Sequence, residues 1–149
     1  ATTILAYSAL PTEVDLEPLR AADTASRTWY LPCIAPNKQL VFRQWNLDAP
    51  LLKNAFGIAQ PAATMPLWHP SEQPTLILLP ALLVDVWGTR LGFGQGYYDR
   101  FLATLSHQET VCAVIDQARV VSQLPKDPWD IPAAFIATQK GIVSTQACV

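Results

Sequence analysis

The stretch from Thr75 to Leu105 constrains the fold more than any other part of the chain. It opens with an apolar run, Leu76 to Val84, interrupted only by Pro80, which predicts a strand buried on both faces. It closes with apolar side chains at the i, i+3, i+4, i+7 spacing of one helix face: Tyr98, Phe101, Leu102 and Leu105. A strand, a loop and a helix in this order form the unit from which parallel α/β sheets are built.

Three glycines at alternate positions, Gly92, Gly94 and Gly96, lie in the connection between that strand and that helix. Such a loop lets backbone N–H groups approach an anion closely, and the following helix N-terminus adds partial positive charge. The same glycines can also serve only to permit positive φ in a tight connection. From the residues alone, the loop is a candidate phosphate site with a tight connection as the alternative.

Two widespread nucleotide motifs fit this loop poorly. No Gly-Lys-Ser/Thr follows the glycines, which excludes a Walker A motif. A dinucleotide fingerprint places its first glycine directly after the strand, whereas residues 85–91 intervene here and the spacing is GxGxG. Asp116 does follow an apolar run about 20 residues later, where a ribose-binding acid would lie. An NAD-dependent oxidoreductase is therefore a disfavoured alternative.

The run from Asp85 through Gly88 and Arg90 to Asp99 resembles the signature of the 5-formyltetrahydrofolate cyclo-ligase family, also called methenyltetrahydrofolate synthetases. In that family a strand ends in Asp, a Gly follows, and then comes Arg-Leu-Gly-x-Gly-x-Gly-Tyr-Tyr-Asp. The segment 57–61 is similar to the family's Gly-Ile-x-Glu-Pro, with Gln in place of Glu. The resemblance extends almost to Gly141. It implies a three-layer, Rossmann-like α/β fold with a mainly parallel sheet and helices on both faces. We expect residues 1–149 to form one such domain.

The resemblance also implies a reaction, the ATP- and Mg²⁺-dependent conversion of 5-formyltetrahydrofolate to 5,10-methenyltetrahydrofolate. The formyl oxygen attacks the γ-phosphate to give an imidoyl phosphate, and the N10 amine then closes the ring and expels phosphate. Such chemistry needs no protein nucleophile, but it needs a phosphate cradle, a metal that neutralises charge and alignment of two substrates. The alternative is a non-catalytic family member that binds folate or nucleotide.

The family pattern assigns residues to each ligand. For ATP these are Arg90, Leu91, Gly92, Phe93, Gly94, Gln95, Gly96, Tyr97 and Tyr98. For folate they are Ser8, Glu13 and Tyr98, and for the metal they are Asp99 and Asp130. No residue is expected to act as a nucleophile, and Arg90 would stabilise charge.

The chemistry of the charged residues suits these roles, but plainer readings exist. A guanidinium can hold a phosphate in bidentate fashion, although Arg90 could instead form a salt bridge with Asp85. A carboxylate can accept paired hydrogen bonds from a pterin, although Glu13 could merely belong to a helix start. Asp99 could be a first-turn helix acid, and Asp130 could be the first residue of an Asx turn.

This chain departs from the family pattern in its cationic residues. Phe93 and Gln95 stand where relatives often carry Tyr, Arg, Gly or Lys, and Trp129 stands where His is common. Relatives also have an upstream helical segment whose Lys and Arg contact ATP phosphates, whereas this chain begins at Ala1 in a strand-like run. We therefore expect residues 1–149 to bind both ligands better than they turn them over.

Periodicity predicts the remaining elements. A capping box at Thr12–Asp15 predicts a helix that continues to about residues 20–24. The Pro-rich region 48–74 is predicted to be irregular, with a helical fragment at Leu51–Phe56. Residues 121–132 are predicted to be a loop. Strands are predicted at residues 2–10, 28–34, 39–46 (half-buried, at an edge), 110–115 and, as the last one, 134–138.

Composition narrows the class of protein. Half of the residues are hydrophobic, 15% are charged and the net charge is −2, which indicates a globular chain without a footprint for nucleic acid. The longest apolar run is too short to span a bilayer. Cys33, Cys112 and Cys148 are too far apart for a disulfide framework, so we expect a reducing cytoplasm. His69 and His107 lack neighbouring ligands, so no structural zinc is expected, and we expect a monomer.

Overall fold

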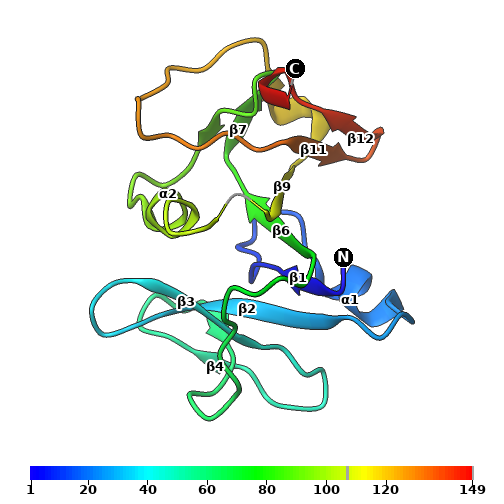
Figure 1. Cartoon of the computed structure of the whole chain (residues 1–149), viewed down its shortest axis with the longest axis vertical. Helices are drawn as coiled ribbons and strands as arrows, with labels where there is room; N and C mark the ends of the chain where they lie inside the picture. Colours follow the sequence, from blue (N-terminus) through cyan, green and yellow to red (C-terminus); the bar gives the residue numbers. More distant parts are fainter. Residues whose placement is uncertain (107, 149) are drawn as a thin grey trace.

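The computed structural model describes residues 1–106 and 108–148, and its centre is one large sheet (Figure 1). Seven strands form this sheet: β1 (Thr3–Leu5), β2 (Thr28–Ile34), β3 (Leu40–Gln44), β6 (Thr75–Pro80), β9 (Thr110–Val114), β11 (Phe135–Thr138) and β12 (Gly141–Ser144). Their order is β12-β11-β9-β6-β1-β2-β3. The five inner strands are mutually parallel, and β3 and β12 are antiparallel edges. The predicted mainly parallel α/β sheet is confirmed.

Smaller elements flank this sheet. One small sheet contains β7 (Leu83–Asp85), β8 (Arg90–Leu91) and β10 (Val120–Val121), and a hairpin contains β4 (Leu52–Lys53) and β5 (Ala59–Gln60). The helices are α1 (Glu17–Ala22), α2 (Tyr97–Leu102) and two 3₁₀ turns, η1 (Gln117–Arg119) and η2 (Gln146–Cys148). The described part therefore has far more strand than α-helix.

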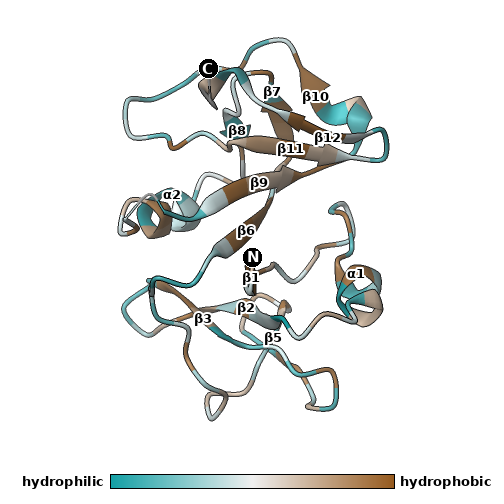
Figure 2. Ribbon diagram, turned by 45° about the vertical axis from the view of Figure 1, so that its right-hand side comes forward, coloured by the Kyte–Doolittle hydropathy of each residue, from teal (hydrophilic) through white to brown (hydrophobic). Residues whose placement is uncertain are grey.

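Strand alternation divides the core between the two faces of the sheet. Ile4 points to one face, where Leu16 packs just before α1, and Leu5 points to the other, where α2 packs. The side chains of Tyr98, Phe101, Leu102 and Leu105 all pack on this second face, as the helical stripe predicts. Figure 2 accordingly shows α1 and α2 on opposite sides of the sheet.

The apolar run 76–84 is two strands rather than the single strand predicted. β6 ends at Pro80, and β7 begins at Leu83 in the small sheet. Proline has no N–H to continue the ladder, so the main sheet loses the chain at that point. Ala81 and Val84 are nevertheless buried, because they pack in a third cluster between the two sheets. Because β6 and β7 are both largely buried, both have apolar sequences, and the break between them cannot be seen in the apolar pattern.

Two helix predictions were wrong in detail. Leu51–Phe56 is part of the β4–β5 hairpin, whose turn is held by Asn54 Oδ1 accepting from the amides of Phe56 and Ile58. Thr12 is not an N-cap, because α1 begins at Glu17 with Pro18 in its first turn.

The last predicted strand is not the final one. β11 is followed by β12, and all four residues of β12 are exposed, which removed the apolar pattern that would have revealed it. The edge strand β3 and the loop that follows β10 agree with the predictions.

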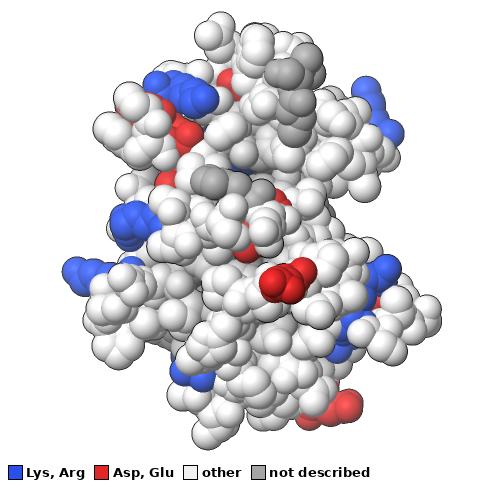
Figure 3. Space-filling model, in the orientation of Figure 1, with Lys and Arg blue, Asp and Glu red and all other residues white. Residues whose placement is uncertain are grey.

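In the part of the chain that the structure describes, no helix is both long and apolar enough to span a membrane. On the face drawn in Figure 3, Lys and Arg lie apart from one another and do not merge into one basic patch.

Gly88 is the glycine whose replacement should disturb the fold most. Its φ is +85°, and an added Cβ would collide with the backbone of Ala133. We expect Gly88→Ala to lower the free energy of unfolding by about 2–5 kcal/mol, the sum of left-handed strain and overpacking. Gly57→Ala is the matched control, because Gly57 has φ +74° but open space around it. Denaturant melts that show equal losses for both variants would contradict the close packing of Gly88 on Ala133.

Candidate active site

The candidate site lies where the paths of the chain diverge at the carboxyl ends of β1 and β6. From β1 the chain proceeds to β2 on one side, and from β6 it proceeds towards β9 on the other. Ligands of open α/β sheets bind in the crevice at such a switch point. The segment after β1 carries Ser8 and Glu13, and the segment after β6 leads to Arg90 and the glycine loop. The two predicted ligand sets thus start from adjacent strands.

Asp85 fixes the loops on the β6 side. Its carboxylate is 1% exposed and accepts hydrogen bonds from the amides of Trp87 and Thr89, both at 3.0 Å. Its second oxygen accepts from the amide of Leu124 at 2.8 Å, in the loop that follows β10. Asp85 therefore joins two loops far apart in sequence, and the alternative reading in which it pairs with Arg90 is wrong.

Arg90 lies at the base of the glycine loop with its side chain only 7% exposed. Its Nη2 is 3.2 Å from Asp99 Oδ1, and its Nε is buried without an acceptor among the described residues. Burial lowers the pKa of Arg90, and the charges of Asp99, Tyr98 and Asp130 oppose that shift. An arginine remains charged under these conditions, so Arg90 keeps a positive charge and an unused donor in the interior.

The glycine loop itself projects into solvent. Residues 92–95 are exposed, and no described residue accepts a hydrogen bond from the amides of residues 92–96. Gly94 and Gly96 have φ values of +82° and +67°, which glycine adopts without strain. Arg100, to which the sequence gave no role, donates to the Gln95 carbonyl at 2.8 Å and lies over the ring of Tyr97. The loop is thus anchored at its end while its amides stay free.

Glu13 and Arg90 both lie close enough to Tyr98 for their charges to act on its hydroxyl. Glu13 Oε1 accepts from the amide of Leu10 at 2.7 Å. Burial raises the pKa of Glu13, although this hydrogen bond lowers it in part. Burial also raises the pKa of Tyr98, with a further contribution from the charge of Glu13 and an opposing one from Arg90. Tyr98 is therefore within the electrostatic influence of both the predicted folate acid and the predicted phosphate cation.

Tyr7 is a neighbour of this group that the sequence reading missed. Its ring is 2% exposed, its hydroxyl donates to the Val14 carbonyl at 2.7 Å, and it contributes to the raised pKa of Tyr98. Its position at the end of an apolar run was the only available signal, and that signal is shared by ordinary core residues. Ser8 follows it and is half-buried.

The two predicted metal ligands both act on Arg90. Asp99 pairs with it, and the charge of Asp130 opposes the lowering of its pKa. Asp130 Oδ2 also accepts from the Asp127 amide at 2.9 Å, three residues earlier, whereas an Asx turn that starts at Asp130 would use the amide two residues later. Among described residues no group of three or more His, Cys, Asp or Glu could hold a metal, and His107 lies outside that part. Two carboxylates suit Mg²⁺, whose remaining coordination positions are usually filled by phosphate oxygens and water.

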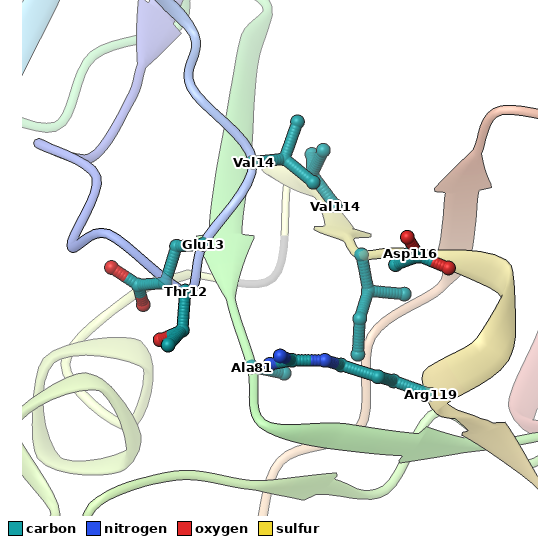
Figure 4. A pocket seen from close by; sticks show the side chains of 8 residues that line it. Thr12, Glu13, Val14, Ala81, Val114, Asp116 and Arg119 are labelled. Atoms are coloured by element: carbon teal, nitrogen blue, oxygen red, sulfur yellow. The ribbon is translucent and has the colours of Figure 1, made fainter.

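A pocket of about 160 Å³ opens next to Glu13, at the ends of β1, β6 and β9 (Figure 4). It is lined by Thr12, Glu13, Val14, Ala81, Val114, Ile115, Asp116 and Arg119. Asp116, which could have been a ribose acid, caps η1 instead, with Oδ1 accepting from the Ala118 amide at 2.8 Å. No residue of 90–99 lines this pocket, so it is separate from the glycine loop.

A sequence model of the 5-formyltetrahydrofolate cyclo-ligase family matches residues 1–139. The chain belongs to this family. The cyclo-ligase of Escherichia coli K12 is 28% identical over 142 residues, which cover 93% of this chain and 78% of that protein. The cyclo-ligase of Mycolicibacterium smegmatis is 36% identical over 107 residues, which cover 68% of this chain and 54% of that protein.

Solved structures of cyclo-ligase relatives share the fold. The 5,10-methenyltetrahydrofolate synthetase of Aquifex aeolicus superposes with a TM-score of 0.81 at 30% identity, covering 97% of this chain and 72% of that one. The synthetase from Mycoplasma pneumoniae gives a TM-score of 0.68 at 20% identity, which supports the fold alone.

Asp85 offers a test of how this cyclo-ligase site is assembled. Asp85→Asn replaces one acceptor oxygen by an NH₂ group that faces a backbone amide, so we expect a loss of about 1–3 kcal/mol in unfolding free energy. Asp15→Asn is the control, because Asp15 is exposed and accepts only from the Glu17 amide. If chemical denaturation gave both variants wild-type stability, the bridging role of Asp85 would be wrong.

Proposed function

We propose that this cyclo-ligase converts 5-formyltetrahydrofolate to 5,10-methenyltetrahydrofolate while it consumes ATP. The observation that carries the proposal is Arg90, a buried cation with an unused donor that lies before the glycine loop and acts electrostatically on Tyr98. A reaction that transfers a phosphoryl group to a bound folate needs such a cation.

The nucleotide occupies the side of Arg90 that carries the glycine loop. The free amides of residues 92–96 donate to phosphate oxygens, and Arg90 donates to the γ-phosphate. Leu91 and Phe93, which are 47% and 60% exposed, and Tyr97 provide apolar surface beside the loop. Asp99 and Asp130 hold Mg²⁺, which neutralises phosphate charge when bound.

The folate occupies the side that carries Glu13. The Glu13 carboxylate accepts from the 2-amino and N3–H groups of the pterin, and Ser8 and Tyr98 line that half of the site. The formyl oxygen attacks the γ-phosphorus, an O–P bond forms and the bond to ADP breaks. N10 then attacks the formyl carbon, loses its proton, and the C–O bond to phosphate breaks. The residues of the chain bind, orient and balance charge without forming a covalent bond.

The proposal also covers the domain organisation, the oligomeric state and the cellular compartment of the enzyme. Residues 1–149 form one domain and act as a monomer, and the free, buried thiols of Cys33 and Cys112 suit a reducing cytoplasm. The partners are ATP and a reduced folate.

An absorbance assay distinguishes the proposed enzyme from a non-catalytic binding protein. The methenyl product absorbs in the near ultraviolet, and we expect it to appear slowly with ATP and not with a non-hydrolysable ATP analogue. Protein is used at substrate-level concentration so that slow conversion is visible. Binding of both ligands without any ATP-dependent absorbance would support a folate- or nucleotide-binding protein instead.

Arg90→Lys tests the nucleotide half. Lysine keeps the charge but loses the planar fork, so we expect calorimetry to give an ATP affinity about 1.5–3 kcal/mol weaker, with folate affinity changed less. Arg27→Lys is the matched control, because Arg27 also pairs with an aspartate, Asp23, but lies on the α1 side. Equal losses for ATP and folate would contradict the assignment of Arg90 to the phosphates.

Glu13→Gln tests the folate half. Because burial raises the pKa of Glu13, the folded chain binds that proton more tightly than the unfolded chain, and stability falls as pH rises above the ordinary range for glutamate. Removing the charge should therefore leave the melting temperature at pH 7 unchanged or slightly higher, while affinity for 5-formyltetrahydrofolate falls.

The pH dependence provides the control for this variant. The stability advantage of Glu13→Gln over wild type should shrink as pH falls towards the pKa of Glu13, because the wild-type carboxyl then becomes neutral. A variant that melts lower at pH 7 and still binds folate would identify Glu13 as a structural residue.

A further inference from the structure

Arg90 and Asp99 are assigned to different ligands, phosphate and Mg²⁺, yet in the structure they bind each other. Arg90 Nη2 lies 3.2 Å from Asp99 Oδ1. Among the described residues, Asp99 is the only one that accepts a hydrogen bond from the Arg90 side chain. The two assignments therefore require this contact to open when the ligands bind.

The contact uses only half of one edge of the guanidinium. The Nε–H and one Nη2–H of an arginine point in the same direction and together match two oxygens of a phosphate. Asp99 accepts from Nη2 alone, and Nε is buried without an acceptor among the described residues. The separation of 3.2 Å is also longer than the usual charge-assisted hydrogen bond of about 2.7–2.9 Å. A phosphate can satisfy both donors once Asp99 has left Nη2.

Burial differs between the two partners in a way that favours such an exchange. The Arg90 side chain is 7% exposed, whereas that of Asp99 is 31% exposed and no described residue donates to its Oδ2. Asp130 places a second negative charge near Arg90 without a hydrogen bond to it. In the free protein these carboxylates compensate a cation that is shielded from water. The phosphates of a bound nucleotide would supply the same compensation.

We propose that Asp99 occupies the phosphate-binding edge of Arg90 in the free protein and leaves it when the nucleotide binds, so that Arg90 pairs with phosphate and Asp99 becomes available to Mg²⁺. The inference rests on the proposed function, because it requires ATP at Arg90. It makes the binding of ATP and Mg²⁺ cooperative, since either ligand separates the pair for the other. Metal-free ATP binds more weakly than the site allows, because it must first displace Asp99.

Calorimetry of Asp99→Asn with ATP, once in EDTA and once in excess Mg²⁺, tests this exchange. Asparagine keeps the shape of the side chain but cannot form the ion pair. We expect metal-free ATP to bind the variant about 5- to 50-fold more tightly than wild type, the range between an exposed ion pair and a charge-assisted hydrogen bond. Excess Mg²⁺ should strengthen ATP binding to wild type and do so much less for the variant, which has lost one metal ligand.

Asp130→Asn is the matched control. Asp130 also acts on the charge of Arg90, but its carboxylate accepts from the Asp127 amide and does not pair with Arg90. Its gain in affinity for metal-free ATP should therefore be clearly smaller than that of Asp99→Asn.

A measurement on wild type makes the test independent of how well the variants fold. Carbon-13 NMR of the labelled chain reports on the Asp99 carboxyl group, whose signal should move when metal-free ATP is added and move again with Mg²⁺. A signal that stays in place until Mg²⁺ is added would show that the pair remains closed, and would overturn the proposal.

The outcomes separate this exchange from the proposed function. If wild type binds ATP but Asp99→Asn binds metal-free ATP no more tightly, Asp99 is a metal ligand without the exchange. An equal gain for Asp130→Asn would reduce the effect to charge alone and contradict the exchange as well. If wild type binds ATP in neither buffer, the nucleotide half of the proposed function is wrong, and the exchange falls with it.

Discussion

The site depends on one buried carboxylate, Asp85. Its two oxygens accept three backbone amides, and hydrogen bonds to a charged acceptor are worth about 1.5–3 kcal/mol each. Two of those amides belong to the turn that leads into β8 and Arg90, and the third belongs to the loop that leads to Asp130. The close packing of Gly88 on Ala133 joins the same two segments a second time. These links help to keep Arg90 and Asp130 close enough for their charges to interact.

Asp85 accepts three hydrogen bonds, whereas other polar groups of the site lack partners or lie in unfavourable surroundings. Arg90 retains a buried donor and Glu13 is held where burial disfavours its charge, whereas the amides of residues 92–96 donate to no described residue and lie in a largely exposed loop. Burying polar groups without partners costs stability, so such groups are rare where they serve folding alone. Their gathering at a switch point of the sheet is what a ligand site requires, because bound ligands complete the missing interactions.

Sequence reasoning predicted the parts of this protein whose signals are local. The parallel strands and the α2 stripe carry short-range patterns, while the roles of Arg90, Asp99 and Glu13 come from the family resemblance and stay predictions. It failed where burial or exposure erased the pattern. Pro80 divides a run that is apolar on both sides, and β12 is exposed on every residue. It also failed where partners are distant in sequence, as for Asp85 with Leu124, because side-chain chemistry does not reveal which amides a carboxylate will reach.

The central claim is that folate and nucleotide bind on opposite sides of one buried cation. Backbone amide NMR of the isotopically labelled chain, titrated separately with Mg²⁺–ATP and with 5-formyltetrahydrofolate, tests it directly. ATP should shift the amides of residues 92–96, folate should shift those of residues 8–14, and both should shift Tyr98. Shifts from ATP that centre on residues 116–119, or an identical set of shifts from both ligands, would contradict the claim.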